Sequence, residues 1–351
     1  MHRESAIVVT GASGFLGRHL LGALRPGHRV VAIDRLSQAE AEIEEHPNVR
    51  WYQIDLADAD ELRDVFGEIR RSGGARALVH LAAYYDCTGE QHPEYERTNV
   101  RATRLVLESS KDLGLRRFIF ASSIAACPFS SPGHPITEDT PPDGKHVYAV
   151  SKRAGEEMLR EHAAYFPTCS IRFAALFSDW CQYPPLYSFL ETWLSEQWNG
   201  RILGGRGESA IPFLHVRDAT DFVLRLLERL DDLEREEVLL ASTDGAVSHN
   251  QLYETATAYY FDKKRRAIHV PRWLCGPGIW TLDVAGRLLG NRPFERPWMA
   301  GYVDRSLEID AARTRQKLGW SPRPRLSILK RIPFMIEHRT SDPIQWHGRN
   351  R

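Results

Sequence analysis

The chain has 351 residues, enough for one large α/β domain or for a nucleotide-binding domain with a smaller appended part. Lys and Arg together number 46, and so do Asp and Glu, so no global charge attracts nucleic acid or an acidic membrane surface. This balance excludes classes of protein that bind nucleic acid or membranes through a large net charge. A small-molecule partner is expected, with neither nucleic acid nor membrane as a partner.

The five cysteines show neither a CxxC pair nor metal-ligand spacing, so reduced thiols in a cytoplasmic protein without a metal site are expected. No apolar run reaches the roughly 18 residues of a membrane-spanning helix. Residues 268–289 come closest, but Arg272, Pro277, Asp283 and Arg287 interrupt them. This stretch is predicted to be a core helix or a pocket wall rather than a membrane anchor.

The first motif begins at residue 6. Residues 6–9 are apolar and β-favouring, and they run into a glycine-spaced turn followed by apolar residues at helical spacing. Gly11 suits a tight turn, Gly14 lets the backbone approach a pyrophosphate, and Gly17 lets the helix pack close to the strand. The pattern predicts a strand, a phosphate loop and a helix whose free N–H groups would face the phosphates.

Acidic residues follow the next two predicted strands. Residues 29–33 end at Asp34, about 20 residues after the loop, where a dinucleotide fold needs a carboxylate for the ribose hydroxyls. Asp34 would repel a 2′-phosphate, so NAD is favoured over NADP, although the adjacent Arg35 keeps NADP as the alternative. Residues 49–54 end at Asp55, which could accept from the adenine amino group. Asp55 and Asp58 could also cap the next helix, which is compatible with that role.

The remaining predicted elements alternate along the chain. Helices are predicted over residues 37–45, 60–71, 96–114 and 148–156, and strands over residues 77–83, 116–123 and 169–173. Such alternation indicates an α/β fold with a Rossmann-type, doubly wound parallel sheet, in which all strands end at one edge. Residues 127–146, rich in Pro and Gly, are predicted to form a loop over that edge.

A change in composition after the last predicted strand suggests a domain boundary. Residues 1–175 are expected to form the NAD-binding domain, and residues 176–335 mainly a smaller substrate-binding part interleaved with it. Most of the large aromatics of this part are expected to be core residues, with some lining a pocket: Tyr183, Tyr187, Phe189, Trp193 and Trp198. Residues 336–351 are taken as a tail, loosely held from Ser341 on.

The predicted chemistry rests on Ser123, Tyr148 and Lys152. Tyr148 and Lys152 are one helical turn apart and share a helix face, which on its own is typical of a surface pair. Ser123, however, ends a strand at the predicted ligand edge. A neighbouring ammonium and an oxidised nicotinamide would favour the phenolate of Tyr148, whose unperturbed pKa is about 10. Tyr148 is therefore interpreted as the acid/base, with Ser123 holding the substrate oxygen and Lys152 the ribose hydroxyls.

These motifs resemble the extended short-chain dehydrogenase/reductase superfamily, the NAD-dependent epimerase/dehydratase group. The matching segments run from residue 6 to about residue 330: Thr10-Gly11-Ala12-Ser13-Gly14-Phe15-Leu16-Gly17, Asp34, Asp55-Leu56, His80-Leu81-Ala82-Ala83, Thr98-Asn99-Val100, Ser122-Ser123, Tyr148-Ala149-Val150-Ser151-Lys152, Phe213-Leu214-His215-Val216-Arg217-Asp218 and Leu318-Gly319-Trp320-Ser321-Pro322.

The resemblance implies a catalytic triad of Ser123, Tyr148 and Lys152, supported by Asn99. It also implies fold-supporting roles for His215 and Asp218. The expected cofactor-binding residues are Gly11, Ser13, Gly14, Phe15, Leu16, Gly17, Asp34, Arg35, Asp55, Leu56, Leu81, Ala82, Ala83, Asn99, Tyr148 and Lys152. A homodimer formed through a helical face is a further expectation from the family.

Three departures from the family pattern bear on the substrate. Ile124-Ala125 replace the acidic pair of the dehydratases, which argues against dehydration. Ile211-Pro212 stand where many sugar-nucleotide enzymes carry a diphosphate-binding arginine. Ala126-Cys127-Pro128 replace the usual Val-Tyr-Gly, and Cys127 is expected to be a buried, inert thiol.

The sequence therefore predicts an NAD-dependent oxidoreductase. It would transfer a hydride reversibly at a secondary alcohol or ketone carbon of a sugar-like or hydrophobic substrate. One alternative is a sugar-nucleotide epimerase that retains its NAD. Another, from a different class, is a non-catalytic NAD-binding sensor or scaffold.

Overall fold

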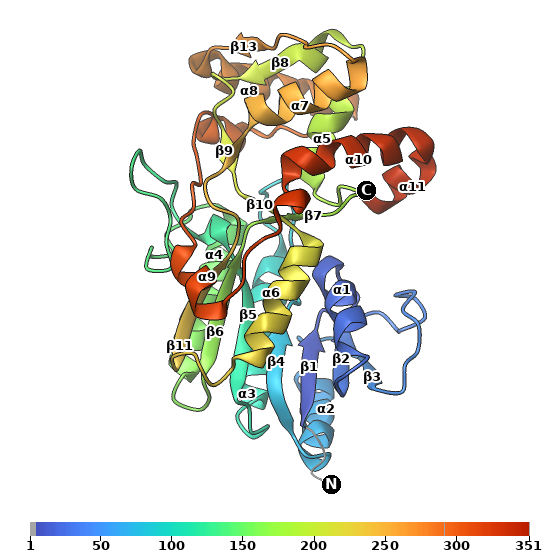
Figure 1. Ribbon diagram of the computed structural model, residues 1–351, viewed down its shortest axis with the longest axis vertical. Helices are drawn as coiled ribbons and strands as arrows, with labels where there is room; N and C mark the ends of the chain where they lie inside the picture. The colour runs from blue at the N-terminus through green and yellow to red at the C-terminus, as the bar shows by residue number, and fades with distance from the viewer. Residues whose placement is uncertain (1–4, 291, 351) are drawn as a thin grey trace.

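The computed structural model describes residues 5–290 and 292–350, and its centre is a parallel sheet of seven strands in the order β11-β6-β5-β4-β1-β2-β3 (Figure 1). The strands are β1 (Ala6–Thr10), β2 (Val30–Asp34), β3 (Val49–Gln53), β4 (Ala75–His80), β5 (Arg117–Ser123), β6 (Thr168–Phe173) and β11 (Glu236–Ala241). The order reverses between β1 and β4, as in a doubly wound fold. This topology confirms the predicted Rossmann-type class.

Helices cover both faces of the sheet, because its central strands are apolar on both sides. Ile7 and Val9 of β1 belong to the core beneath α1 (Phe15–Leu24) and α6 (Val216–Glu228). Val8 points into the opposite core. That second layer consists of α2 (Ala59–Arg71), α3 (Ala102–Ser109) and α4 (Val147–His162).

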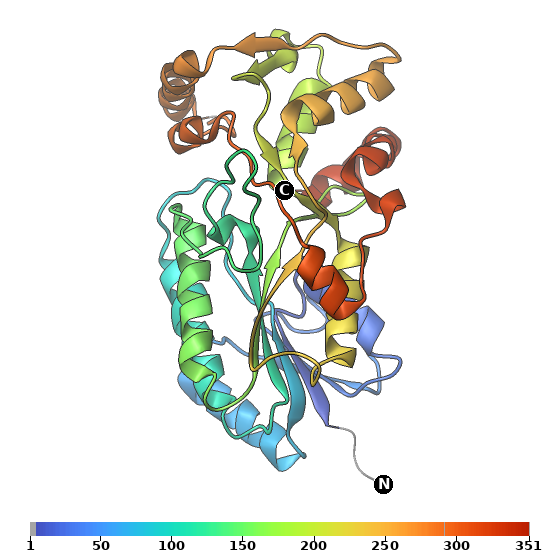
Figure 2. The same ribbon diagram turned by 60° about the vertical axis from the view of Figure 1, so that its left-hand side comes forward.

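A smaller part lies above the carboxyl edge of the sheet, as Figure 2 shows. Its core is built around Trp193, Tyr253 and Trp346. It contains α5 (Pro184–Trp193), α7 (His249–Phe261), α8 (Arg272–Leu289), α10 (Ile328–Ser341) and α11 (Pro343–Asn350). Three short strand pairs join it: β7 (Ala175–Phe177) with β10 (Phe213–His215), β8 (Ile202–Gly204) with β13 (Ile268–Val270), and β9 (Ala210–Ile211) with β12 (Val247–Ser248).

The chain passes between the two parts more than once. After residue 175 it enters the smaller part, then returns to the sheet through α6 and β11, which pairs with β6. The loop over residues 127–146 is held by a late segment of the chain: the Ile136 N–H donates to the Glu308 carbonyl at 2.7 Å. Next to this segment stands α9 (Ala312–Leu318), whose Thr314 hydroxyl donates to Glu138 at 2.6 Å.

Several predicted elements differ in the structure. Residues 37–45 form turns rather than a helix, and Glu42 has a φ of 53°, which a right-handed helix does not accommodate. The fourth strand ends at His80, not at residue 83. The helix predicted over 96–114 is a π-helix, η1 (Tyr95–Arg101), continued by α3, which ends at Ser109. Composition alone does not reveal a π-helix. A π-helix has a different pattern of backbone hydrogen bonds from an α-helix, but its polar and apolar residues still follow a helical pattern.

The prediction of a loosely held C-terminal segment is wrong. The boundary expected at residue 336 falls inside α10, and residues 343–350 form a helix. Trp346 is fully buried, and its indole N–H donates to Glu191 at 3.0 Å. The apolar content of this segment is low, but one large side chain suffices to dock it.

Of the two alternatives predicted for residues 268–289, a core helix or a pocket wall, the core helix is wrong. The segment forms β13 and α8, and most of the apolar side chains of α8 are exposed. Helical spacing identified the helix, but it does not say whether anything covers the apolar face. Among the described residues, no helix is both long enough and apolar enough to cross a membrane.

Truncating Trp346 tests whether α11 is part of the folded unit. We expect Trp346→Ala to lower the free energy of unfolding by about 3 kcal/mol or more, because it leaves a cavity in the core. The measurement is the midpoint of urea unfolding. Ile344→Ala in the same helix is the matched control, since Ile344 is exposed and should change stability by less than about 0.5 kcal/mol. Equal effects of the two substitutions would contradict the docking.

Candidate active site

The glycine loop joins β1 to α1 as predicted. Gly11 has a φ of 69°, and a Cβ there would lie 2.6 Å from the Ala82 backbone nitrogen. A Cβ on Gly17 would collide with the Gly11 carbonyl oxygen. Gly14 is the N-cap of α1 and supplies no side-chain cap, so the first N–H groups of the helix lack a side-chain acceptor. A bare helix N-terminus beside a close backbone turn has the form that a pyrophosphate requires.

The predicted ribose-binding carboxylate lies beside this loop. Asp34 accepts hydrogen bonds from the backbone N–H of Ser13 at 2.8 Å and of Leu36 at 3.2 Å. Arg35 is turned to Glu94, with 3.6 Å between their charged atoms, and does not pair with Asp34. The residues present therefore fit an adenosine ribose with free hydroxyls better than one with a 2′-phosphate.

Asp55 lies at the end of the third strand, as expected, but it does not cap the next helix. It accepts from the Ala57 N–H at 2.9 Å and pairs with Arg97 of η1. Asp58, the other predicted cap, is the N-cap of α2. Arg97 and hydrogen bonds hold the pKa of Asp55 below its usual range, although burial opposes them.

The segment after β4 faces the glycine loop. The Leu81 N–H donates to the Thr10 carbonyl at 3.1 Å, and Ala82 lies against Gly11. Ala83 follows in the same extended stretch. The structure therefore brings these three predicted cofactor residues to the edge where the loop opens.

Asn99 ties three parts of the site together. Its side-chain oxygen accepts from the Tyr84 N–H at 2.6 Å, and its amide donates to the Tyr84 carbonyl and the Ser151 hydroxyl, both at 2.9 Å. Asn99 lies in the π-helix η1 and is buried. Such bulged helices occur often at functional sites, because the extra residue redirects a side chain.

Ser123, Tyr148 and Lys152 meet at the carboxyl end of β5. Ser123 is its last residue, and Tyr148 is the second residue of α4. The Ser123 hydroxyl lies close enough to the Tyr148 phenol to lower the pKa of that phenol. Lys152 is buried one turn further along, with Nζ 5.6 Å from the centre of the Tyr148 ring. It donates to the Ala121 carbonyl at 2.7 Å. The structure therefore brings the predicted triad together.

The electrostatics of the triad differ from the sequence prediction. Burial raises the pKa of Tyr148 to about 12, although the Ser123 side chain lowers it. Burial likewise lowers the pKa of Lys152 to about 8, while Glu156 raises it. The predicted stabilisation of the phenolate is thus outweighed by desolvation in the chain alone.

Sequence reasoning missed the buried ion pair behind Lys152. Glu156, one turn after Lys152, pairs with Arg172 of β6 at 3.0 and 2.8 Å and accepts from the Ser122 hydroxyl. All three side chains are buried. Glu156 is visible in the sequence at helical spacing from Lys152, but its partner on β6 is not.

Aromatic residues around Tyr148 were also missed. Tyr85 meets the Tyr148 ring edge to face at 4.8 Å. His146, the N-cap of α4, stacks against Tyr148 at 6.1 Å and against Trp298 at 6.0 Å. Burial lowers the pKa of His146 to about 4, so it is neutral near pH 7. No local motif signals Trp298, because it comes from η4 (Pro297–Tyr302), far along the chain.

Several other residues singled out from the sequence support the fold rather than the chemistry. Cys127 is buried, and burial raises the pKa of its thiol to about 11, as an inert cysteine requires. His215 caps α6, and Asp218 pairs with Arg323. The aromatics between residues 183 and 198 pack mostly in the smaller core, but Trp198 is exposed.

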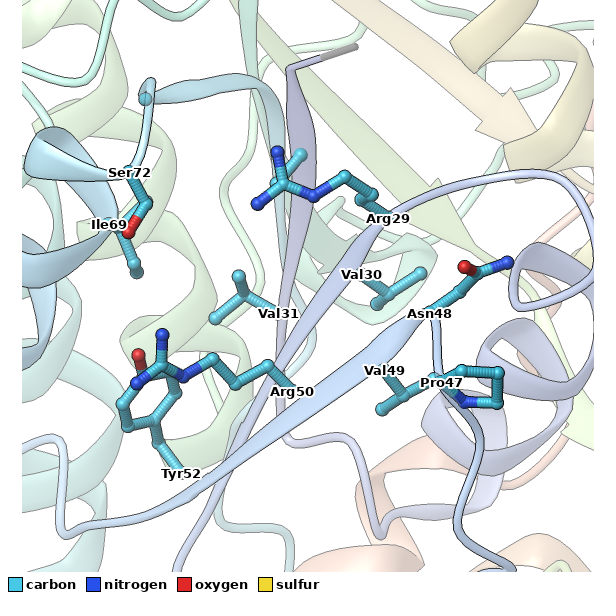
Figure 3. Close-up of a pocket in the computed structure, with 12 residues that line it drawn as sticks. Arg29, Val30, Val31, Pro47, Asn48, Val49, Arg50, Tyr52, Ile69 and Ser72 are labelled. Atoms are coloured by element: carbon cyan, nitrogen blue, oxygen red, sulfur yellow. The ribbon is translucent and has the colours of Figure 1, made fainter. Parts of the chain in front are cut away.

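A surface pocket of about 220 Å³ lies at the opposite edge of the sheet, near Arg29, Asn48, Arg50 and Tyr52 (Figure 3). It is formed at the amino ends of β1, β2 and β3. Ligands of open parallel sheets bind at the carboxyl ends, so this pocket is not the predicted site. Across residues 5–290 and 292–350, no group of His, Cys, Asp and Glu side chains could hold a metal ion.

The fold and the glycine loop, with a serine, tyrosine and lysine at one sheet edge, define a nucleotide-binding protein of the short-chain dehydrogenase type. Residues 7–241 match the model of the NAD dependent epimerase/dehydratase family. Because this match covers more than half of the chain, the chain belongs to that family. The match confirms the predicted superfamily.

Two curated relatives illustrate the range of the family. The chain is 33% identical over 181 residues to the UDP-glucose 4-epimerase of Erwinia amylovora, covering 48% of this chain and 52% of the relative. It is 26% identical over 189 residues to the 3 beta-hydroxysteroid dehydrogenase/Delta 5-->4-isomerase of Vaccinia virus (strain Copenhagen), covering 49% and 52%. The chain thus spans about half the length of these relatives.

Solved structures share the fold over nearly the whole chain. MoeE5 in complex with UDP-glucuronic acid and NAD has a TM-score of 0.67 and 24% identity, with 99% of this chain and 100% of that chain covered. The UDP-glucose 4-epimerase of Thermotoga maritima with UDP-glucose has a TM-score of 0.70 and 22% identity, with 95% and 98% covered. Both include the smaller part above the sheet.

The buried Lys152 should cost stability at neutral pH. Its pKa falls from 10.5 to about 8 on folding, so below pH 8 both states carry the proton and the full cost of about 3 kcal/mol is present. Between pH 8 and 10.5 only the unfolded chain holds the proton, and the cost disappears as pH rises. Lys152→Met removes this cost but also the hydrogen bond to the Ala121 carbonyl, which contributes about 1 kcal/mol. We therefore expect the substitution to raise the free energy of unfolding by about 2 kcal/mol at pH 7.

Urea unfolding at pH 7 and at pH 10.5 measures this effect, which should be largest at pH 7. Lys145→Met is the matched control, because Lys145 is exposed and its substitution should leave stability nearly unchanged at both pH values. A Lys152→Met protein no more stable than wild type at pH 7 would show that the ammonium is not buried at a cost.

Proposed function

We propose that the chain is an NAD-dependent oxidoreductase that transfers a hydride reversibly at a secondary alcohol or ketone carbon of a small, sugar-like or hydrophobic molecule. The observation that carries this proposal is the placement of Ser123 at the end of β5, beside an α4 that carries Tyr148 and the buried ammonium of Lys152, with Nζ 5.6 Å from the centre of the Tyr148 ring. One curated relative is named a hydroxysteroid dehydrogenase, which acts at such a carbon.

The cofactor would lie across the carboxyl ends of β1, β2 and β4. Gly11, Gly14 and Gly17 would surround its pyrophosphate, and Asp34 would accept from the adenosine ribose hydroxyls. The other proposed contacts come from Ser13, Phe15, Leu16, Arg35, Asp55, Leu56, Leu81, Ala82, Ala83, Asn99, Tyr148 and Lys152. Residues 1–175 would hold the cofactor, and residues 176–335 mainly the substrate.

When bound, NAD supplies a nicotinamide carbon that takes or returns the hydride. The chain's own residues move the proton. Tyr148 exchanges it with the substrate hydroxyl, and Ser123 orients the substrate oxygen by a hydrogen bond. Lys152 holds the nicotinamide ribose hydroxyls, and its positive charge favours the phenolate once substrate and cofactor exclude water. Asn99 is a positioning residue that fixes the segment after β4 against α4.

Replacing the phenol tests this assignment. We expect Tyr148→Phe to reduce kcat by at least about 100-fold, because no other side chain at this position can exchange the proton. NAD affinity, measured by calorimetry, should change far less. Tyr165→Phe is the control, since Tyr165 is an exposed aromatic just after α4. Turnover at the wild-type rate in Tyr148→Phe would refute the mechanism.

A sugar-nucleotide epimerase that keeps its NAD bound is the second candidate function. It uses the same serine, tyrosine and lysine, and it is favoured by the curated relative that is a UDP-glucose 4-epimerase. Ile211-Pro212, in place of a diphosphate-binding arginine, stands against it. Arg201, Arg206 and Arg217 are the cations that could substitute.

Cofactor retention separates the two candidates. We expect the protein purified without added cofactor to be free of NAD, because a dehydrogenase must exchange its cofactor at every turnover. Absorbance near 260 nm and intact mass under native conditions measure the bound nucleotide, with a purified UDP-glucose 4-epimerase as the control. One NAD per chain would instead assign the epimerase.

A non-catalytic sensor remains the candidate of a different class. It would bind NAD without turnover on a panel of alcohols, ketones and sugar nucleotides. An intact serine, tyrosine and lysine set argues against it, because binding alone does not need a proton-transfer group.

The proposal also includes the oligomeric state and the location of the protein. We propose a homodimer formed through a helical face. We also propose a cytoplasmic location, where the five free thiols stay reduced.

A further inference from the structure

The helix α8 presents its apolar side to solvent. With 100° of rotation per residue, Trp273, Leu274, Trp280, Leu288 and Leu289 fall on one half of the helix surface. With Leu282, these residues are called the α8 face. All six are exposed.

The opposite half of α8 packs against the protein. Cys275, Asp283 and Gly286 are its buried residues, and Asp283 pairs with Arg287 and Arg292. The α8 face itself carries no charged side chain. An ordinary surface helix has the reverse arrangement, so this face is built to be covered.

The neighbouring strand pair extends the apolar surface. Ile268 begins β13 and is exposed, and it pairs with Ile202 of β8. Trp198, four residues before β8 begins, is exposed over 80% of its surface. Figures 1 and 2 place β8, β13 and α8 at the end of the molecule farthest from the N-terminus and beyond the sheet.

Basic side chains flank this surface. Lys263, Lys264 and Arg266 precede β13, and Arg272 begins α8; all four are exposed. None of them forms an ion pair with a carboxylate within residues 5–290 and 292–350. The guanidinium of Arg265, between them, stacks on Phe261 at 3.4 Å. The cations are therefore available to an anionic partner.

Two coverings of the α8 face can be compared. In a symmetric contact with a second copy, the same patch meets itself, so the unpaired cations of both copies would be brought together. An anionic lipid surface offers opposite charge at the headgroups and hydrocarbon beneath them. Trp273 and Trp280 also suit the boundary between headgroups and acyl chains, where indole rings gather.

We propose that the α8 face docks the protein on the surface of an anionic phospholipid bilayer. The helix lies in the plane of the interface, with its apolar half among the upper acyl chains and Lys263, Lys264, Arg266 and Arg272 at the phosphates. Its 18 residues span about 27 Å along that plane. The expectation of no membrane partner followed from balanced overall charge, whereas four basic residues without an ion pair gather beside the α8 face, next to one exposed acid, Asp262.

Docking through α8 also orients the candidate site. α8 packs on η4, whose Trp298 stacks on His146 and donates from its indole N–H to the Thr88 carbonyl. His146 in turn lies against Tyr148. η4 therefore connects α8 to the aromatic side chains around Tyr148. This inference is independent of the proposed reaction and stands if the chain proves to be an epimerase.

Vesicle co-sedimentation of the full chain tests the proposal. Wild type should pellet with vesicles of phosphatidylglycerol and phosphatidylcholine in equal amounts, and at least about tenfold less with phosphatidylcholine alone. Trp280→Ser/Leu288→Ser should lose binding by at least about tenfold. The matched control is Tyr165→Ser/Ile344→Ser: Tyr165 and Ile344 are exposed by 58% and 88%, against 60% and 83% for Trp280 and Leu288.

Charge reversal gives a second measurement. Lys263→Glu/Lys264→Glu should weaken binding to the anionic vesicles and reduce its salt dependence, while circular dichroism and NAD affinity stay as in wild type. Light scattering of each variant reports the oligomeric state. Failure of wild type to pellet with the anionic vesicles, or undiminished pelleting of the α8 double variant, would overturn the proposal. So would a wild-type dimer that the α8 double variant converts to a monomer without losing vesicle binding.

Discussion

Burial of the Lys152 ammonium is the constraint around which the candidate site is built. A charged amine at this depth requires compensation, and the structure provides it from two sides: the Ala121 carbonyl accepts its hydrogen bond, and Glu156 raises its pKa. Glu156 is itself held by Arg172 from the neighbouring strand β6. The position of α4 over the ends of β5 and β6 follows from this chain of contacts, and the position of Tyr148 follows from α4.

The desolvation that makes Lys152 costly also raises the pKa of Tyr148. A phenol with a pKa of about 12 is a poor base in the chain alone, so its activity would depend on what binds next to it. A positively charged nicotinamide and an ordered substrate oxygen would each favour the phenolate. Tyr148 would therefore be protonated in the chain alone, and its phenolate would be favoured only when cofactor and substrate are bound.

Local patterns predicted most of the fold and the core of the site. The glycine loop, Asp34, Ser123, Tyr148 and Lys152 could be found because each lies in a motif whose spacing reflects one strand, turn or helix. The predictions failed where the outcome depends on distant contacts. Trp346 anchors an otherwise polar C-terminal helix in the core. Trp298, far along the chain, stacks on His146, which stacks on Tyr148. Glu42 takes a left-handed backbone conformation. The prediction of a core helix at α8 failed for a related reason, because the spacing of apolar residues does not show which neighbours cover the helix.

The return of the chain to the sheet through β11 has a consequence for how the two parts depend on each other. β6 pairs with β5 on one side and with β11 on the other, and β11 arrives only after the chain has passed through much of the smaller part. A protein cut after residue 175 would leave β6 as an open edge, with its outer backbone groups unpaired and prone to associate with other chains. The segment before residue 175 is therefore not a self-sufficient module. Sequence changes between residues 176 and 241 must remain compatible with β11, the strand that completes the sheet beside β6.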